Sequence, residues 1–416
     1  SGFQTNWYWK QNNIPDGTYF KFMRTERKNI VVLQSGGCTP VINESLWGVV
    51  TGSQKHLPSS QVFGALRGVE GLISGSLTNL TNVCDSDWIT VRQTPGAALG
   101  STRKKLTDGD VQPLLETLER QHIGYVFLIG GNDTADTTTK ISAAGRASGI
   151  PLTAIHVPKT IDNDLVQTDH SPGYGSAARF VALATMGAGQ DAISMGKASP
   201  ITVIEVMGRD AGWLAMASGL GKRSSQDPPH FIGIPEVPIC EELFVQIMSK
   251  AYTDFGFAVA VVSENCRGTN GILGPKSKPF LVDDFGHAYY EGPGKYLSNL
   301  LSRTLSTRVR HEYPGSIQRS FVENTSSPDR SEAELVGLAA SKAASEGLTD
   351  SMVTLVRSSD SPYQCETGLT PVATVANRVA AVPSDYHTPD TNLPTEYFHK
   401  YAAPLIGSAL PEFLRF

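Results

Sequence analysis

The sequence predicts an α/β protein with two domains, each built on a mainly parallel sheet covered by helices. Short apolar runs rich in β-branched residues alternate with longer stretches of helical period, which is typical of parallel βαβ units. The 416 residues exceed what one such sheet normally holds, so two are expected. The 40 glycines fit many tight strand-to-helix turns better than a helical bundle.

The individual elements follow from local patterns. Continuous apolar runs predict strands at 28–34, 125–129, 152–157, 201–206, 230–234, 257–262 and 352–356. The first two run directly into the glycine pairs Gly36-Gly37 and Gly130-Gly131. Helices are predicted at 111–118, where apolar residues recur at i, i+3, i+4 and i+7, and at 180–195 and 335–344.

The domain boundaries are less sharply marked. We expect residues 1–172 to form the first domain, with roughly 318–385 returning to it, and 173–317 to form the second. The turn-rich segment 267–292 predicts an irregular excursion or flap. The Pro-rich and aromatic tail, 386–416, predicts a surface wrap or an oligomer contact.

Composition excludes several classes of protein. The net charge is 35 − 40 = −5, which argues against binding a nucleic acid. No run of about 18 apolar residues predicts a membrane span, and the first residues show no secretory signal. Five widely spaced cysteines without a CxxC pair favour free thiols in a soluble, cytoplasmic protein. The nine histidines lack metal-ligand spacing and no GxSxG occurs, so a zinc enzyme or a serine hydrolase is not expected.

Two glycine turns are candidates for anion binding. The segments SGGCTP (35–40) and GGNDT (130–134) each join a predicted strand to a helix, where backbone N–H groups and the helix N-terminus can face an anion. Alternatively, these glycines only permit left-handed backbone and close packing. Neither turn matches GxGxxG or GxxxxGK[ST], which disfavours the dinucleotide and Walker motifs.

The segment PKTIDND (158–164) adds chemistry to these turns. It follows the strand at 152–157, and ligands of open α/β sheets bind at that edge. Asp162 can take a proton while Asp164 holds a metal or orients its partner, with Lys159 supplying a cation. The alternative is a solvated turn. Arg103, Arg209, Arg310 and Arg319 suit phosphate recognition, although isolated arginines more often form surface ion pairs.

The ordered set SGGxxPxxN, LGSxR, GGNDT, PKTIDND, IEVMGR, PEV and GxIQR, running from Ser35 to Arg319, resembles the phosphofructokinase family, and more narrowly its pyrophosphate-dependent branch. The resemblance implies reversible phosphoryl transfer from pyrophosphate to the 1-hydroxyl of fructose 6-phosphate, with Mg²⁺. It also implies a homodimer or homotetramer, because arginines of a neighbouring subunit, here Arg310, complete the sugar-phosphate pocket. The first domain would bind the donor and the second the sugar phosphate.

The resemblance also implies a role for each matching position. The catalytic positions are Asp162 as base, supported by Thr160 and Asp164. The donor positions are Gly36, Gly37, Arg103, Gly131, Asp133 and Lys159. The sugar-phosphate positions are Thr160, Asp162, Met207, Gly208, Arg209, Glu236, Arg310, Ser316 and Arg319. The metal positions are Asn132 and Asp133.

Two positions predict the donor. ATP-dependent relatives have glycine where Asp133 and Lys159 stand. A carboxylate at Asp133 would occupy the space of a nucleotide α-phosphate, and Lys159 would compensate the smaller pyrophosphate. An ATP-dependent phosphofructokinase is the alternative within the family.

Some positions depart from the family pattern. Asn132 replaces a magnesium-ligating Asp, Val41 replaces a glycine, Pro200 stands where short members carry an interface arginine, and Ser316 replaces His or Tyr. These departures leave a non-catalytic regulatory subunit, or another sugar such as sedoheptulose 7-phosphate, as alternatives. They also predict that Mg²⁺ binding depends on pyrophosphate oxygens and on Asp133 or Asp164.

Overall fold

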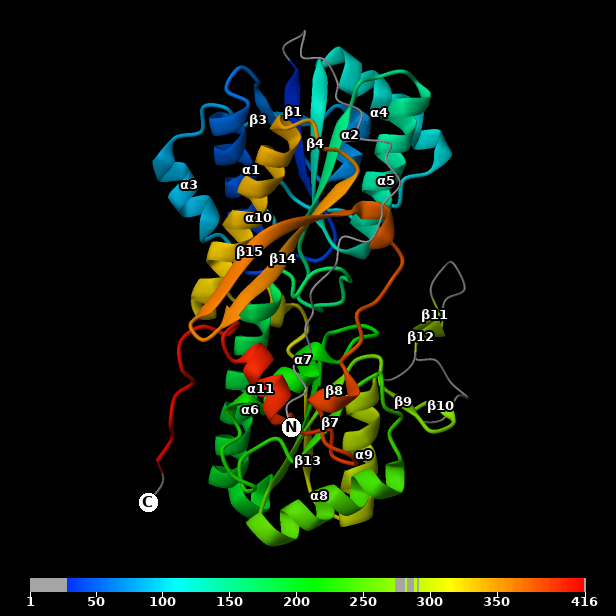
Figure 1. The fold of residues 1–416 in the computed structure, drawn as a ribbon. Coiled ribbons are helices and arrows are strands. Elements are labelled where there is room, and N and C mark those ends of the chain that lie inside the picture. The colour runs from blue at the N-terminus through cyan, green and yellow to red at the C-terminus, as the bar shows by residue number, and fades with distance from the viewer. Residues whose placement is uncertain (1–27, 274–280, 283–287, 290–291, 415–416) are drawn as a thin grey trace, which may run out of the picture.

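Two sheets, each with helices on both faces, form the two ends of an elongated molecule (Figure 1). The computed structural model describes residues 28–273, 281–282, 288–289 and 292–414. The predicted class, α/β with mainly parallel sheets, is confirmed.

The first sheet has seven strands in the order β15-β14-β5-β4-β1-β2-β3. They are β1 (Asn29–Gln34), β2 (Val62–Ala65), β3 (Leu77–Asn79), β4 (Ile123–Gly130), β5 (Thr153–Pro158), β14 (Ser351–Asp360) and β15 (Tyr363–Pro371). All neighbours from β2 through β14 pair in parallel, whereas β3 and β15 close the edges in antiparallel pairing.

Successive side chains of β1 enter two different cores, as the pleat of a strand requires. Ile30 and Val32 pack with one set of helices, and Val31 and Leu33 pack with the other. The first set is α1 (Ile42–His56), α3 (Asp85–Arg92) and α10 (Ser327–Ser345). The second set is α2 (Val69–Ser74), α4 (Asp108–Arg120) and α5 (Asn132–Ala147).

The second sheet has four parallel strands in the order β13-β6-β8-β7. They are β6 (Ile201–Val206), β7 (Phe231–Gly233), β8 (Ala258–Ser263) and β13 (Val309–Glu312). On one face pack α6 (Tyr174–Met195), α7 (Trp213–Ala217) and α11 (Glu396–Ala402). On the other pack α8 (Glu241–Phe255) and α9 (Pro293–Leu305).

The C-terminal part of the chain visits both sheets. After β13 the chain returns through α10, β14 and β15 to the first sheet. It then crosses back, and Phe398, Tyr401 and Leu405 enter the core of the second. The tail is therefore a buried component of the second core, and Figure 1 shows α11 against α6 and α7.

All seven predicted strands and all three predicted helices are present, but four strands in the sheets were not predicted. The strands β2 and β3 are short, and β13 is a partly exposed edge. The strand β15 lies at an edge of the first sheet, and half-buried and exposed residues mostly alternate along it. Edge strands bury less apolar surface, so β3, β13 and β15 lack the continuous apolar run that marks a central parallel strand. The strand β2 lies inside the sheet, but its apolar run is only four residues long.

Several sequence-based expectations concern regions that are only partly described. Residues 1–27, where a secretory signal was not expected, lie outside the described residues. Of 267–292, the described part contains the antiparallel pairs β9 (Arg267–Gly268) with β10 (Gly271–Ile272), and β11 (Leu281–Val282) with β12 (Ala288–Tyr289).

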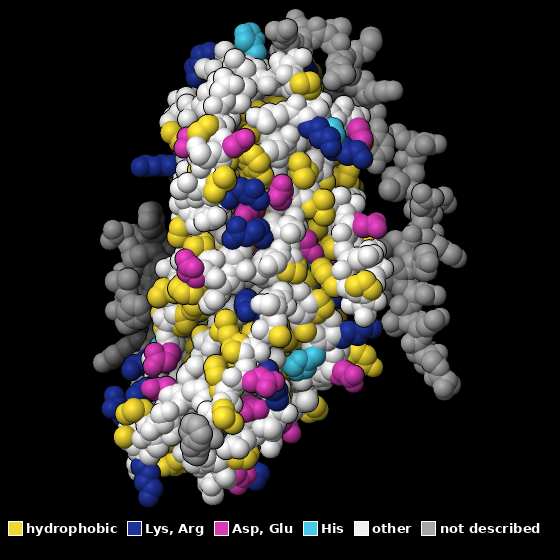
Figure 2. Space-filling model, turned by 90° about the vertical axis from the view of Figure 1, so that its left-hand side faces the viewer, with side chains coloured by type: hydrophobic (Ala, Val, Ile, Leu, Met, Phe, Trp, Pro, Cys, Tyr) yellow, Lys and Arg dark blue, Asp and Glu magenta, His cyan; other side chains and the backbone are white. Residues whose placement is uncertain are grey.

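Within the described residues, no helix is long and apolar enough to cross a membrane. All five cysteines are free thiols. On the face shown in Figure 2, Lys and Arg side chains are interspersed with Asp and Glu.

Candidate active site

A cleft lies where the carboxyl ends of β1, β4 and β5 face the carboxyl end of β6. The residues that follow each of these strands line it, which is where ligands of open α/β sheets bind. Up to residue 137 it is lined by Ser35, Gly36, Gly37, Cys38, Thr102, Arg103, Lys104, Lys105, Gly131, Asn132, Asp133, Thr134 and Thr137. The remaining lining residues are Lys159, Thr160, Ile161, Asp162, Asp164, Met207, Arg209 and Arg319.

The glycine turn after β1 lets two cations approach the backbone. Gly36 has a left-handed φ of 76°, and a Cβ on Gly37 would lie 2.7 Å from Nη1 of Arg319. The ammonium of Lys159 donates to the carbonyl of Gly37 over 2.5 Å. A side chain at position 37 would therefore push the guanidinium of Arg319 out of its place beside the turn.

Lys159 is a buried cation, with 3% of the residue exposed. Burial lowers the pKa of its ammonium to about 8, although the carboxylates of Asp162 and Asp164 act in the opposite direction. Around neutral pH the ammonium is therefore mostly charged and has little water around it. A phosphoryl oxygen that entered the cleft would compensate this charge more fully than the single carbonyl does.

Asp162 and Asp164 lie on one turn and influence each other. Burial raises the pKa of Asp162 to about 7, and the neighbouring Asp164 adds to the rise. Burial also raises the pKa of Asp164. Arg209 lies 3.8 Å from Asp162 (Nε to Oδ2), and the hydroxyl of Thr160 accepts the backbone N–H of Asp162 over 3.0 Å. A carboxylate whose pKa is close to neutral is suited to general-base work.

Asn163 holds this turn from behind. It has a left-handed φ of 56°, so its side chain points away from those of its neighbours and into the protein. Its amide donates to the hydroxyl of Tyr401 over 2.7 Å and accepts the N–H of Ser171 over 3.0 Å. The hydroxyl of Tyr401 donates in turn to the carbonyl of Asp169 over 2.9 Å. The C-terminal helix α11 therefore supports the carboxylate turn.

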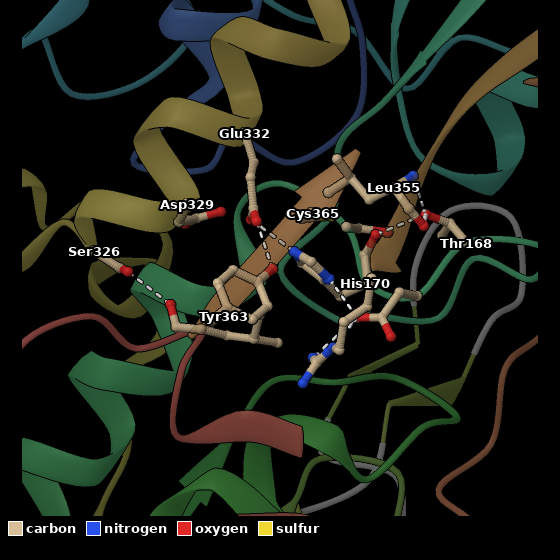
Figure 3. A network of polar contacts seen from close by, with 12 residues as sticks. Thr168, His170, Ser326, Asp329, Glu332, Leu355, Tyr363 and Cys365 are labelled. Carbon is tan, nitrogen blue, oxygen red and sulfur yellow. Dashed lines mark hydrogen bonds and ion pairs between the residues drawn. The ribbon is translucent and has the colours of Figure 1, made fainter. Parts of the chain in front are cut away.

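A buried charged network extends this support. His170 lies between Asp169 and Glu332, with 2.7 Å to each carboxylate, and Figure 3 shows Glu332 also meeting the hydroxyl of Tyr363. Burial alone would lower the pKa of His170, but hydrogen bonds to the two carboxylates raise it to about 9. The network joins the loop after Asp164 to α10 and to the β14–β15 hairpin.

The second domain contributes part of the predicted sugar-phosphate set. Met207, Arg209 and Arg319 reach the cleft, and Gly208 (φ 139°) lies between the first two. Glu236 does not line the cleft, and its Oε1 accepts the N–H groups of Gly212 (3.0 Å) and Val382 (2.9 Å).

Two other predicted sugar-phosphate residues also lie outside the cleft. Ser316 is in the short 3-10 helix Gly315–Arg319. Arg310 pairs with Asp191 in a separate hollow beside β13.

The predicted donor and metal positions all line the cleft. Arg103 lines the cleft, and Asp133 is 61% exposed with its carboxylate 3.6 Å from Lys105. The side chain of Asn132 forms hydrogen bonds with the backbone of Asn377 and Arg378. Among the described residues no group of three His, Cys, Asp or Glu side chains could hold a metal ion.

Sequence reasoning missed some lining residues. Cys38, Thr137 and Ile161 lie beside residues that were selected, but their types carried no chemical signal. Lys104 and Lys105 belong to the cationic run after Gly100-Ser101, where only the arginine was chosen.

The fold and the cleft define a two-domain α/β protein in which a glycine turn with two cations and a pair of carboxylates line one cleft. The phosphofructokinase family model matches residues 29–344. The chain is 37% identical over 393 residues to the pyrophosphate–fructose 6-phosphate 1-phosphotransferase of Rhodospirillum rubrum, covering 93% of this chain and 96% of that protein. The corresponding values for the enzyme of the same name from Halomonas elongata are 35%, 92% and 93%.

A solved structure shows the same fold at similar identity. The crystal structure of a pyrophosphate-dependent phosphofructokinase from Nitrosospira multiformis matches with a TM-score of 0.84 at 32% identity, covering 93% of this chain and 94% of that one. The chain belongs to the phosphofructokinase family, and the resemblance inferred from the motifs is confirmed.

Proposed function

We propose that this chain catalyses reversible phosphoryl transfer between pyrophosphate and the 1-hydroxyl of fructose 6-phosphate, giving fructose 1,6-bisphosphate and phosphate. The observation that carries the proposal is the buried Lys159, which donates to the glycine turn at Gly37 and lines the same cleft as the carboxylate pair Asp162 and Asp164. The names of the relatives at 35% and 37% identity support it.

The residues act by alignment and charge neutralisation, which supply most of the catalysis in phosphoryl transfer. Asp162 accepts the proton of the attacking hydroxyl, and its raised pKa matches that task. Thr160 fixes the backbone of the base through its hydroxyl. Lys159 and Arg319, both at Gly37, neutralise charge on the transferred group.

The donor is proposed to be pyrophosphate rather than ATP. Lys159 occupies the floor beside Gly36 and Gly37, and Asp133 places a carboxylate at the outer end of the cleft. That carboxylate repels a longer polyphosphate, whereas Lys159 serves the short one. The alternative, an ATP-dependent enzyme, would need both side chains to be accommodated around a nucleotide.

Mg²⁺ is proposed to be held mainly by pyrophosphate oxygens, with Asp133 or Asp164 completing its shell. The described residues fit this arrangement because they offer separate carboxylates around the cleft and no preformed cluster of three. When bound, Mg²⁺ would neutralise charge on the donor and keep several waters. Asn132 stands at the family's ligand position, but its amide is engaged elsewhere.

A homodimer or homotetramer in a reducing cytoplasm is also proposed. Arg310 lies in a hollow bordered by the exposed side chains of Tyr313 and Ile317, away from the cleft of its own chain. It would instead serve the cleft of a neighbouring subunit. Mixing an inactive Asp162→Asn protein with an impaired Arg310→Ala protein should then restore activity. Two variants that do not complement each other would contradict shared sites.

The test of the reaction is a set of steady-state rates with purified protein. Each donor, pyrophosphate or ATP, is combined with fructose 6-phosphate or sedoheptulose 7-phosphate, with Mg²⁺ throughout. We expect turnover with pyrophosphate and fructose 6-phosphate, and negligible turnover with ATP. If kcat/KM is higher with sedoheptulose 7-phosphate than with fructose 6-phosphate, the seven-carbon sugar is the substrate. The small Ser316, which replaces a larger side chain, would be consistent with that result. Sugar-phosphate binding without turnover on any donor would indicate a regulatory subunit.

A further inference from the structure

The segment 377–382 crosses from the first sheet to the second and binds three predicted site residues through its backbone. It follows β15 and the short 3-10 helix Val372–Thr374, and leads into the tail that carries α11. We call this segment the strap.

The first attachment is to Asn132, at the N-terminus of α5. The backbone N–H of Asn377 donates to Oδ1 of Asn132 over 2.6 Å, and Nδ2 of Asn132 donates to the carbonyl of Arg378. One attachment needs an acceptor and the other needs a donor. An amide provides both, whereas a carboxylate can only accept.

The other attachments are to the carboxylate turn and to the second domain. The N–H of Ala380 donates to the backbone carbonyl of Asp164 over 2.9 Å, and its carbonyl accepts the indole N–H of Trp213 over 2.8 Å. The N–H of Val382 donates to Oε1 of Glu236 over 2.9 Å. Within six residues the strap therefore joins α5, the carboxylate turn and Glu236.

We propose that Asn132 is a positioning residue: it anchors the strap, and through the strap it sets the positions of Asp164 and Glu236 relative to the donor end of the cleft. This assignment rests on the proposed function for its effect on catalysis, but not for the strap itself. This role explains why an amide stands at position 132. An aspartate would place a carboxylate oxygen against the carbonyl of Arg378, which would then lose the N–H donor that the amide supplies.

The experiment compares Asn132→Asp and Asn132→Ala with the wild type, using Asn82→Asp as a control. Asn82 is exposed and does not line the cleft, so its substitution makes the same change of charge without touching the strap. The kinetic readouts are kcat, the KM for each substrate and the Mg²⁺ concentration that gives half-maximal rate.

We expect both Asn132 variants to lower kcat and raise the KM for the sugar phosphate, together reducing kcat/KM by roughly ten-fold or more. Neither variant should reach its half-maximal rate at a lower Mg²⁺ concentration than the wild type. A variant Asn132→Asp that works at lower Mg²⁺ with an unchanged sugar KM would overturn the proposal and assign this position to the metal.

A second readout needs no turnover. Arg378 is exposed, so trypsin can cleave after it once the strap is released. Limited proteolysis of the substrate-free proteins, with fragments identified by mass, should show faster cleavage after Arg378 in both Asn132 variants than in Asn82→Asp. Equal cleavage rates would refute the anchor. If the wild type turns over none of the substrates, the proposed function fails, and this readout still decides whether Asn132 holds the strap.

Discussion

Replacing Asp162 by Asn tests the base most directly, because the amide keeps the shape of the carboxylate but cannot accept the proton of the sugar hydroxyl. Loss of a general base costs roughly 10²–10⁴-fold in kcat. Binding of both substrates should change little, since Arg209, 3.8 Å from the carboxylate, still lines the cleft.

The raised pKa adds a pH signature. With the pKa of Asp162 at about 7, the wild-type rate should fall about ten-fold per pH unit below that value as the base is protonated. At the other side, the pKa of Lys159 is about 8, so rising pH discharges the cation that faces the donor. The rate should therefore peak between these two values, and Asp162→Asn should lack the acidic limb.

Stability should move in the opposite direction to activity. Between its ordinary pKa of 3.8 and the folded value of about 7, Asp162 binds a proton in the folded protein but not in the unfolded chain. Its contribution to stability is therefore lost as pH rises through this window. The neutral amide avoids that loss, so at about pH 8 Asp162→Asn should be more stable than the wild type by on the order of 1–4 kcal/mol.

The assay pairs a pH profile of kcat with denaturant unfolding at pH 5 and pH 8 for both proteins. A gain in stability at the higher pH together with lost activity separates removal of the base from misfolding. A near wild-type kcat, or a variant that keeps the acidic limb, would show that another group takes the proton.

Three further changes test other parts of the site. The double variant Asp133→Gly, Lys159→Gly should weaken the use of pyrophosphate and admit some ATP. An unchanged ratio of kcat/KM for the two donors would disprove that Asp133 and Lys159 select the donor. His170→Ala removes the cation from the buried carboxylate of Glu332, whereas Asp169 keeps its ion pair with Arg357, and should cost about 3–5 kcal/mol at pH 7. In the wild type, the stabilisation from His170 should be complete below its ordinary pKa of 6.5 and lost as pH rises through about 9, so unfolding experiments that show no such decline would contradict its role. Tyr401→Phe removes the hydroxyl bonded to the carboxylate turn and should lower kcat roughly ten-fold without changing the circular dichroism spectrum, whereas an unaltered kcat would show that the turn holds itself.

The central strands could be predicted from sequence because a strand that is buried on both faces is made mostly of consecutive apolar residues. The strands β1, β4, β5, β6 and β8 are mainly apolar runs, each buried along most of its length. The antiparallel β15 carries no such run, because its register and its place at the edge are set by β14, which precedes it by a short turn. The return of residues 327–371 to a sheet begun at Asn29 is a long-range pairing that no local pattern encodes.

In the candidate site, too, some residues could be predicted from the sequence and others could not. Residues on the turns after strands could be selected, since parallel strands bring their carboxyl ends to one edge. The supports of those residues could not. Tyr401 lies 238 residues from Asn163, and Arg378 lies 246 residues from Asn132, so neither contact has a spacing that sequence inspection could detect. Glu236 was selected by motif, but its bonds to Gly212 and Val382 became visible only in the fold.

The strand order also dictates when the chain can finish folding during synthesis. The strand β5 ends at Pro158, yet its partner β14 begins at Ser351, after all four strands of the second sheet have left the ribosome. Until then β5 presents an unpaired parallel edge, the kind of edge that associates with other chains. The second sheet also cannot complete its core until Phe398 and Tyr401 have been synthesised. A ribosome that stalls, or a message truncated, before residues 351–401 have been translated should therefore yield aggregates and protease substrates rather than a shorter enzyme with reduced activity.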